Sequence, residues 1–228
     1  MTILLAIETS TDLASVALLH NHHIICRDLS GVQTHSYGLL PALQELLQEA
    51  GVNLNQLNAI AFGCGPGAFT GVRTACGVVQ GLAFGLQIPV LPVVSLLAMA
   101  EAAKSAEQRL DFVCCLDARM NEVYWAHYRL EGEAWLEIQA PSLSDLTTAL
   151  AYAREAKLTL VLGQGLALPD ADEGLPTILV MPHAQFALQI AEKNYKQGLA
   201  IDAAQAQPLY LRNKVAQTTA ERALARET

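Results

Sequence analysis

The strongest constraint on the fold is a pattern of elements that the chain carries twice. Each copy consists of an apolar strand, an acidic turn, a second strand, a tight turn and a third strand. The strand-like runs are residues 3–7, 13–19 and 24–29 in the first copy and residues 112–116, 123–130 and 134–138 in the second. Runs of β-branched and apolar residues bounded by polar turns are typical of strands. Such internal repetition predicts two related structural units in one chain.

Both copies continue in the same way after the third strand. An amphipathic helix follows at residues 38–50 in the first copy and at residues 144–156 in the second. A short buried strand comes next, at 59–62 and at 158–162, and each of these strands ends in glycines. Strands and helices in this order predict α/β units with mixed sheets flanked by helices.

We expect the boundary between the two units in the charge-rich segment 102–109, which gives an N-terminal lobe of residues 1–103 and a C-terminal lobe of residues 104–228 that ends in a basic tail. In such a duplicate the acidic turns at Glu8 and Asp117 face each other across a cleft. This arrangement is similar to the two RNase H-like lobes of the actin, sugar-kinase and Hsp70 superfamily, where the two turns hold the phosphates of a nucleotide and its metal ion.

A glycine-rich turn, residues 63–73, joins the strand at 59–62 to the next helix and reads Gly-Cys-Gly-Pro-Gly-Ala-Phe-Thr-Gly-Val-Arg. A strand-to-helix turn of this kind leaves backbone N–H groups free to bind an anion. However, it has neither P-loop nor Rossmann spacing, and no lysine follows, so we favour a structural turn before a closely packed helix. The candidate nucleotide or phosphate contacts are Glu8, Thr9, Ser10, Gly65, Gly67, Thr70, Gly71 and Asp117.

Two helices carry candidate surfaces for a partner protein. The helix at 38–50 has an apolar stripe, and the helix after the glycine-rich turn has three glycines spaced four residues apart. Each glycine costs about 1 kcal/mol relative to alanine inside a helix, so we expect the close approach of another backbone to offset that cost. This backbone belongs either to the same lobe or to another subunit. The predicted interface residues are Leu39, Leu43, Leu46, Leu47, Gly77, Gly81 and Gly85.

Composition argues against two classes of protein. The 228 residues include 14 basic and 22 acidic side chains, a formal charge of −8, and the body of the chain has no basic cluster that would neutralise nucleic-acid phosphates. Residues 74–100 carry no charged side chain, which resembles a membrane span, but their prolines, glutamines and glycines favour a helix followed by a strand. Five cysteines without disulfide or metal spacing, and a start without a leader, predict a cytoplasmic protein.

The histidines His20, His22 and His23 have the composition of a metal-binding tract but the wrong geometry for one. Adjacent residues of a strand point to opposite faces, so His22 and His23 cannot both face one ion. We expect an exposed hairpin tip here, and we predict no metal site and no catalytic residue in the chain.

Five separate motifs, in the same order along the chain, resemble those of the TsaB (YeaZ) family. They are residues 4–10, residues 34–36 with 39–41, residues 65–73, residues 117–119 with 122–124, and residues 208–212. The resemblance implies a bacterial subunit needed for the threonylcarbamoyl modification of tRNA. In that family the modified base is the adenosine beside the anticodon of tRNAs that read codons beginning with A.

The resemblance also implies a division of labour with TsaD, a larger paralogue that carries the metal, the nucleotide site and the transfer chemistry. TsaD-like chains have a His-x-x-x-His pair on one helix, a spacing that lets both side chains bind one metal ion. Leu96 and Ala100 stand at the aligned positions here. The implied role is a non-catalytic scaffold and activator of a TsaD-like partner, together with a TsaE-like ATPase, with tRNA bound only through the complex.

When the partner is absent, we expect the predicted interface surface to pair with its own copy and give a homodimer. We expect no cofactor of the chain's own, since any weak ATP or ADP binding is expected at the partner interface. A second hypothesis is an enzyme, a weak ATP-binding or ATP-hydrolysing kinase-like protein in which Glu8 and Asp117 hold Mg²⁺ against phosphates. The sequence shows no clear catalytic base for it.

Overall fold

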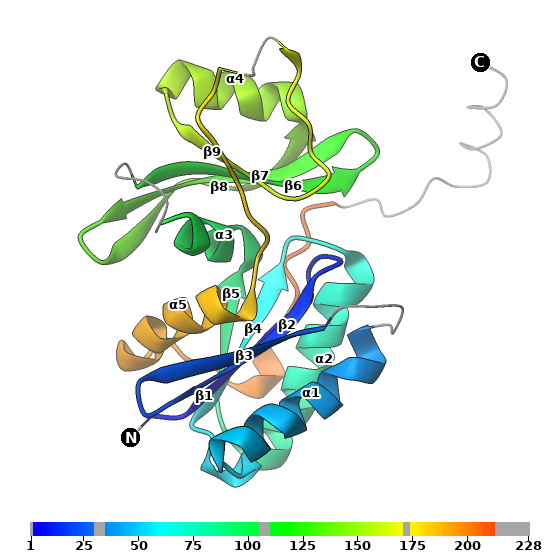
Figure 1. Cartoon of the computed structure of the whole chain (residues 1–228), viewed down its shortest axis with the longest axis vertical. Helices are drawn as coiled ribbons and strands as arrows, with labels where there is room; N and C mark the ends of the chain where they lie inside the picture. Colours follow the sequence, from blue (N-terminus) through cyan, green and yellow to red (C-terminus); the bar gives the residue numbers. More distant parts are fainter. Residues whose placement is uncertain (1, 30–34, 105–109, 171–173, 213–228) are drawn as a thin grey trace, which may run out of the picture.

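The structure is a computed structural model that describes residues 2–29, 35–104, 110–170 and 174–212. Two five-stranded mixed sheets lie one above the other along the long axis of the molecule, and each has helices on both faces (Figure 1). The predicted α/β architecture with two lobes is therefore confirmed. The predicted basic tail after Arg212 lies outside the described residues.

The two sheets have the same topology. The first contains β1 (Leu4–Glu8), β2 (Ala14–His20), β3 (His23–Leu29), β4 (Ala59–Gly65) and β5 (Val90–Val94). The second contains β6 (Asp111–Arg119), β7 (Glu122–Glu131), β8 (Ala134–Asp145), β9 (Thr159–Leu162) and β10 (Thr177–Leu179). Their orders are β3-β2-β1-β4-β5 and β8-β7-β6-β9-β10, with one antiparallel meander and two parallel strands in each. The repeat that the sequence predicted is thus a repeat of structure.

Helices cover both faces of each sheet (Figure 1). They are α1 (His35–Ala50), α2 (Phe69–Leu86), α3 (Ser95–Ala103), α4 (Leu146–Ala156) and α5 (Ala184–Lys196), with short 3₁₀ turns η1 (Leu54–Gln56) and η3 (Ala203–Gln205). Because strand side chains alternate, Leu5 and Ile7 of β1 face α1 and α2, whereas Leu4 and Ala6 face α5. A sheet buried on both faces explains the almost continuous apolar run of β1.

The expected division at residue 103/104 separates the two sheets but does not hold for α5. This helix lies in the second half of the sequence, yet Ala184 and Leu188 pack against Leu4 in the first lobe. The chain then stays with the first lobe, where Ile201 and Val90 form a β-bridge. The physical reason is that β1, β2, β4 and β5 would otherwise expose an apolar face, which α5 covers.

The apolar stripe of α1 is part of the core of the first lobe. Leu39, Leu43, Leu46 and Leu47 are all buried there, against residues of β1, β2 and β4. The prediction that these leucines form a partner interface is therefore wrong, because an amphipathic helix presents such a stripe to its own sheet. The exposed residues of α1 lie on its other side.

The uncharged segment 74–100 folds as most of α2, then β5, then part of α3. This confirms the predicted helix followed by a strand. Among the described residues, no helix combines the length and the hydropathy needed to cross a membrane. The predicted hairpin tip is also confirmed, since His20 pairs with His23 across a turn in which Asn21 and His22 have positive φ angles.

The glycine-rich turn packs directly against the turn that follows β1. A Cβ atom on Gly71 would lie 1.8 Å from the carbonyl oxygen of Thr9, and one on Gly67 would lie 2.2 Å from that of Ser10. The backbone N–H of Ala68 donates to the Ser10 carbonyl at 2.6 Å, and Thr9 Oγ1 donates to the Gly71 carbonyl at 2.8 Å. Only glycine permits two backbones to come this close, so the loop has a structural reason for its composition.

Replacing Gly71 with alanine should destabilise the protein by about 3 kcal/mol or more, because the new methyl group would overlap the Thr9 carbonyl. Gly77→Ala is the matched control on the same helix, since a Cβ there meets no atom within 4 Å. That variant should be more stable than the parent by about 1 kcal/mol. Urea unfolding of both variants measures the two changes, and equal effects would contradict the packing described.

Candidate functional site

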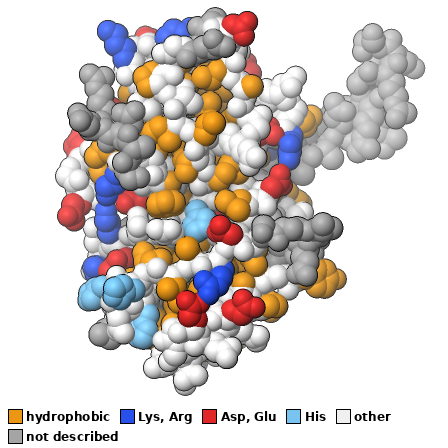
Figure 2. All heavy atoms as spheres, viewed as in Figure 1, with side chains coloured by type: hydrophobic (Ala, Val, Ile, Leu, Met, Phe, Trp, Pro, Cys, Tyr) orange, Lys and Arg blue, Asp and Glu red, His pale blue; other side chains and the backbone are white. Residues whose placement is uncertain are grey.

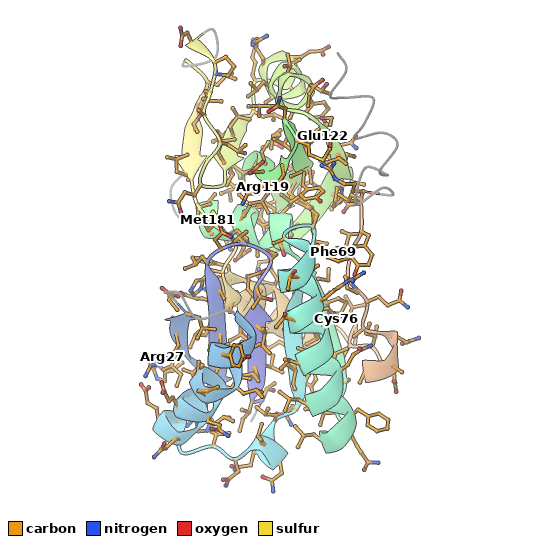
Figure 3. The ribbon with its side chains drawn as sticks, turned by 90° about the vertical axis from the view of Figure 1, so that its right-hand side faces the viewer. Arg27, Phe69, Cys76, Arg119, Glu122 and Met181 are labelled. Atoms are coloured by element: carbon orange, nitrogen blue, oxygen red, sulfur yellow. The ribbon has the colours of Figure 1, made fainter. Side chains whose placement is uncertain are left out.

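A cleft of about 560 Å³, here called the interlobe cleft, lies between the two lobes. The first lobe contributes the turn after β1 and the start of α2, and the second contributes the turn between β6 and β7. Residues 209–212 line one side. Figure 3 shows Phe69 at the end of α2 nearest the second lobe, with Arg119 and Met181 across the boundary.

Three of the eight candidate ligand contacts line the interlobe cleft, namely Ser10, Gly67 and Asp117. The other five do not. Glu8, Thr9, Gly65 and Gly71 are buried beneath or within the glycine-rich turn, and Thr70 is exposed on α2 outside the cleft. The predicted group of contacts therefore does not form one surface toward a ligand.

Glu8 was expected at the cleft, but its side chain is completely buried. Its Oε1 accepts a hydrogen bond from the Ser10 backbone N–H at 2.7 Å, and its Oε2 accepts one from Ser95 Oγ at 2.9 Å. The side chain fits because a Cβ atom on Gly63 would lie 2.0 Å from Oε2. Burial raises the pKa of the Glu8 carboxyl above its ordinary value of 4.5, although hydrogen bonds from Ser10 and Ser95 oppose that shift. Glu8 fixes the base of the turn and does not reach a ligand.

Asp117 does line the cleft, but local partners already hold its carboxylate. Oδ1 accepts from the Arg119 backbone N–H at 2.8 Å, and Oδ2 lies 3.1 Å from Nη1 of the same arginine. The metal-binding pair of Glu8 and Asp117 that the enzyme hypothesis requires is therefore not formed. In the described parts of the chain, no group of three His, Cys, Asp or Glu side chains is arranged to hold a metal ion.

Leu96 and Ala100, at the positions aligned with the TsaD histidines, are completely buried. They lie one turn apart on α3 and pack against Phe112 and Leu116 of the second sheet. In this chain that face of α3 is part of the core between the lobes.

The glycines of α2 that face away from the sheet are the second candidate site. A Cβ atom on Gly77, Gly81 or Gly85 would meet nothing within 4 Å, and all three glycines are exposed. The closely packed neighbour that we expected for these glycines is therefore not found among the described residues of the same lobe. Phe84 lies beside these glycines with 80% of its surface exposed.

Sequence reasoning missed the residues that close the side of the cleft, above all Phe69, Tyr210 and Arg212. The motif at residues 208–212 indicated that this segment matters, because it is one of the five motifs that resemble the family. It did not indicate where the segment packs. Its contacts lie more than 85 residues away in sequence, a separation that no local pattern encodes.

Glu8→Gln should change how stability depends on pH. In the parent, the Glu8 carboxyl of the unfolded chain loses its proton above its ordinary pKa of 4.5, whereas the buried carboxyl of the folded chain keeps its proton up to its raised pKa. The contribution of Glu8 to the free energy of unfolding is therefore fully present below pH 4.5 and is lost as pH rises between these two pKa values. Glutamine keeps the shape without this loss. The free energy of unfolding of the parent minus that of the variant should fall by up to about 1.4 kcal/mol per pH unit in that window, and a pH-independent difference would contradict the assignment.

Comparisons with known proteins agree with the sequence motifs. A family model described as TsaD: tRNA N6-adenosine threonylcarbamoyltransferase matches residues 29–167. The tRNA threonylcarbamoyladenosine biosynthesis protein TsaB of Haemophilus influenzae is 38% identical over 93% of this chain and 94% of its own length. The TsaB protein of Escherichia coli is 34% identical over 93% of this chain and 96% of its own length.

Two solved structures from Pseudomonas aeruginosa show the same fold. One, of an uncharacterized protein with similarity to peptidase YEAZ, has a TM-score of 0.81 and 38% identity and covers 93% of this chain and all of that one. The other, of YeaZ, has a TM-score of 0.79 and 37% identity over 92% of this chain and all of that one. The chain therefore belongs to the TsaB (YeaZ) family of tRNA threonylcarbamoyladenosine biosynthesis proteins.

Proposed function

We propose that this chain serves tRNA threonylcarbamoyladenosine biosynthesis as a non-catalytic subunit. It docks on a TsaD-like catalytic paralogue in the cytoplasm and supports transfer of the threonylcarbamoyl group to the adenosine beside the anticodon of tRNAs that read codons beginning with A. The observation that carries this proposal is the exposed row of glycines on α2, Gly77, Gly81 and Gly85.

The glycine row lowers the stability of α2 in the isolated chain. Three glycines in one helix weaken it by about 1 kcal/mol each relative to alanine. The inward-facing glycines of the first lobe, such as Gly67 and Gly71, are explained by close backbone contacts. The glycine row on α2 has no such contact within the described chain. A partner helix or strand whose backbone approaches this smooth surface would offset the cost.

Large apolar side chains are exposed on α2 and on the neighbouring helix α1. Phe84 of α2 and Tyr37 of α1 are 80% and 79% exposed, and Leu40 of α1 is 47% exposed. The two helices lie side by side on the same face of the first sheet (Figure 1). Exposed aromatic anchors beside a surface of small residues are typical of a protein interface. We call these three side chains and the glycine row the docking face.

The remaining features support a scaffold rather than an enzyme. Glu8 is enclosed under its turn, and Leu96 and Ala100 are core residues. The formal charge of −8 means that affinity for tRNA must come mainly from partners. On the face drawn in Figure 2, Lys and Arg side chains are scattered among acidic ones and form no continuous patch.

The same proposal covers the other expected partners. A TsaE-like ATPase would join the complex, and tRNA would bind only through it. Any weak binding of ATP or ADP belongs at the interface with the partner. In the absence of the paralogue, the docking face would pair with its copy on a second chain and give a symmetric homodimer.

Gly81→Glu should weaken binding to the TsaD-like paralogue by more than about tenfold, because a long charged side chain would separate the two backbones. The isolated variant should be at least as stable as the parent, since glutamate is a better helix former than glycine. Titration calorimetry with the purified paralogue measures the affinity, and thermal unfolding measures the stability.

The matched control is Ala151→Glu, which places the same side chain at an exposed position of α4 in the other lobe. It should leave the affinity unchanged. Unaltered binding by the Gly81 variant, or equal loss in both variants, would overturn the assignment of the docking face.

A further inference from the structure

The segment Ala206–Arg212, here called the strap, leaves the first lobe, passes along the interlobe cleft and ends on the second lobe. Its first part is attached to the first lobe by one backbone hydrogen bond and one hydrogen bond from a side chain. The Leu209 N–H donates to the Cys64 carbonyl of β4 at 2.7 Å, and Gln80 Nε2 of α2 donates to the Ala206 carbonyl at 2.9 Å. These contacts anchor the strap to both elements that flank the glycine-rich turn.

An aromatic cluster strengthens the first attachment. The guanidinium carbon of Arg73 lies 3.6 Å from the centroid of the Phe69 ring and 5.5 Å from that of Tyr210. Arg73 Nε also donates to Tyr210 Oη at 2.6 Å. A cation held over an aromatic face is attracted by the negative charge of the ring face. Since Phe69 and Arg73 both belong to α2, the cluster ties the strap to the helix that carries the docking face.

Arg212 makes the second attachment. Its Nη2 donates to the Ala118 carbonyl at 3.0 Å and lies 2.6 Å from Oε2 of Glu122, while Nη1 lies 3.1 Å from the sulfur of Met120. Only 17% of the Arg212 side chain is exposed. A charge-assisted pair with a second bond to a carbonyl fixes the guanidinium in position as well as stabilising it.

The turn between β6 and β7, which Arg212 contacts, has a strained backbone. Arg119, Met120 and Asn121 have φ angles of 63°, 58° and 60°. Consecutive left-handed residues other than glycine are unfavourable, because the Cβ atom comes too close to the following carbonyl oxygen. Arg212 holds Ala118 just before this turn and Glu122 just after it. The second lobe therefore presents a shaped receptor for this arginine, independent of the contacts on the first lobe.

We propose that the strap is a clasp that sets the opening of the interlobe cleft, with Arg212 as its latch on the second lobe. The three steps from Leu209 to Arg212 span at most about 10 Å. The lobes therefore cannot separate on this side unless one attachment breaks. The Arg212 latch is the one that releases, because it depends on side chains, one of them the 36% exposed Glu122, whereas the first attachment includes a backbone bond to a buried strand.

Release of the latch would widen the cleft, since residues 209–212 form one of its walls. The opposite side would act as the hinge, because α3 packs against strands of both sheets. The strap thus ties the relative position of the lobes to the Arg212 latch, beside weaker contacts between them such as the exposed pair of Arg119 and Asp12 at 3.9 Å.

Distances between spin labels on the two lobes test the clasp in the isolated full chain. Labels are placed at Thr70→Cys on α2 and Ala151→Cys on α4, both exposed positions, and the labelled protein is diluted with unlabelled protein. Cys26, half-buried, is replaced by serine. The other four cysteines are buried, and burial raises the pKa of each thiol, to about 12 for Cys64 and Cys115, so they do not react with the label.

The parent should give one narrow distance distribution. Arg212→Ala should broaden it and shift it to longer distances, and Glu122→Gln should do the same if Arg212→Ala does not fold. Arg129→Ala is the matched control, because Arg129 pairs with Asp111 inside the second lobe, and it should leave the distribution unchanged. A broad distribution in the parent, or a parental distribution in the folded Arg212 or Glu122 variant, would overturn the proposal.

Discussion

The close contact between two backbones, the turn after β1 and the glycine-rich turn after β4, determines much of the first lobe. Gly67 and Gly71 allow the approach, and Thr9 and Ser10 provide the carbonyl oxygens that would collide with any side chain there. The contact encloses Glu8 and sets the start of α2. Because α2 is fixed in this way, its buried face and its exposed glycine row have defined directions.

Two sets of glycines thus lie within one stretch of sequence and have opposite surroundings. Those of the turn are needed because atoms of the same lobe press against them. Those further along α2 have no atom of the described chain within 4 Å of where a Cβ would lie, and glycine inside a helix is unfavourable for the isolated chain. The first set is required for folding, whereas the second leaves a surface that is available to another molecule. The spacing of the glycines in the sequence could not distinguish the two sets.

The sequence predicted the duplicated topology well, because strand and helix periodicities in both copies are strong and local. Its predictions failed where the tertiary surroundings of a residue determine whether that residue is buried or exposed. The stripe of Leu39, Leu43, Leu46 and Leu47 has the pattern of any amphipathic helix, and that pattern cannot say whether a sheet or a partner covers it. Glu8 was expected in the cleft because a carboxylate ends β1. Its side chain is buried instead, because Gly63 has no Cβ atom and leaves space for it. The packing of α5 on the first lobe and the path of the strap between the lobes depend on contacts between residues far apart in the sequence.

The role proposed for this chain is to contribute a docking face to its partner, and no chemistry. Threonylcarbamoyl transfer to tRNA in a reaction reconstituted from purified subunits tests it most directly, with the Glu8→Gln/Asp117→Asn double variant compared with Gly81→Glu. The double variant should keep the parental rate within about threefold, while Gly81→Glu should lose activity in proportion to its weaker docking and regain it at high subunit concentration. Loss of turnover in a double variant that is folded and docks normally would contradict the account.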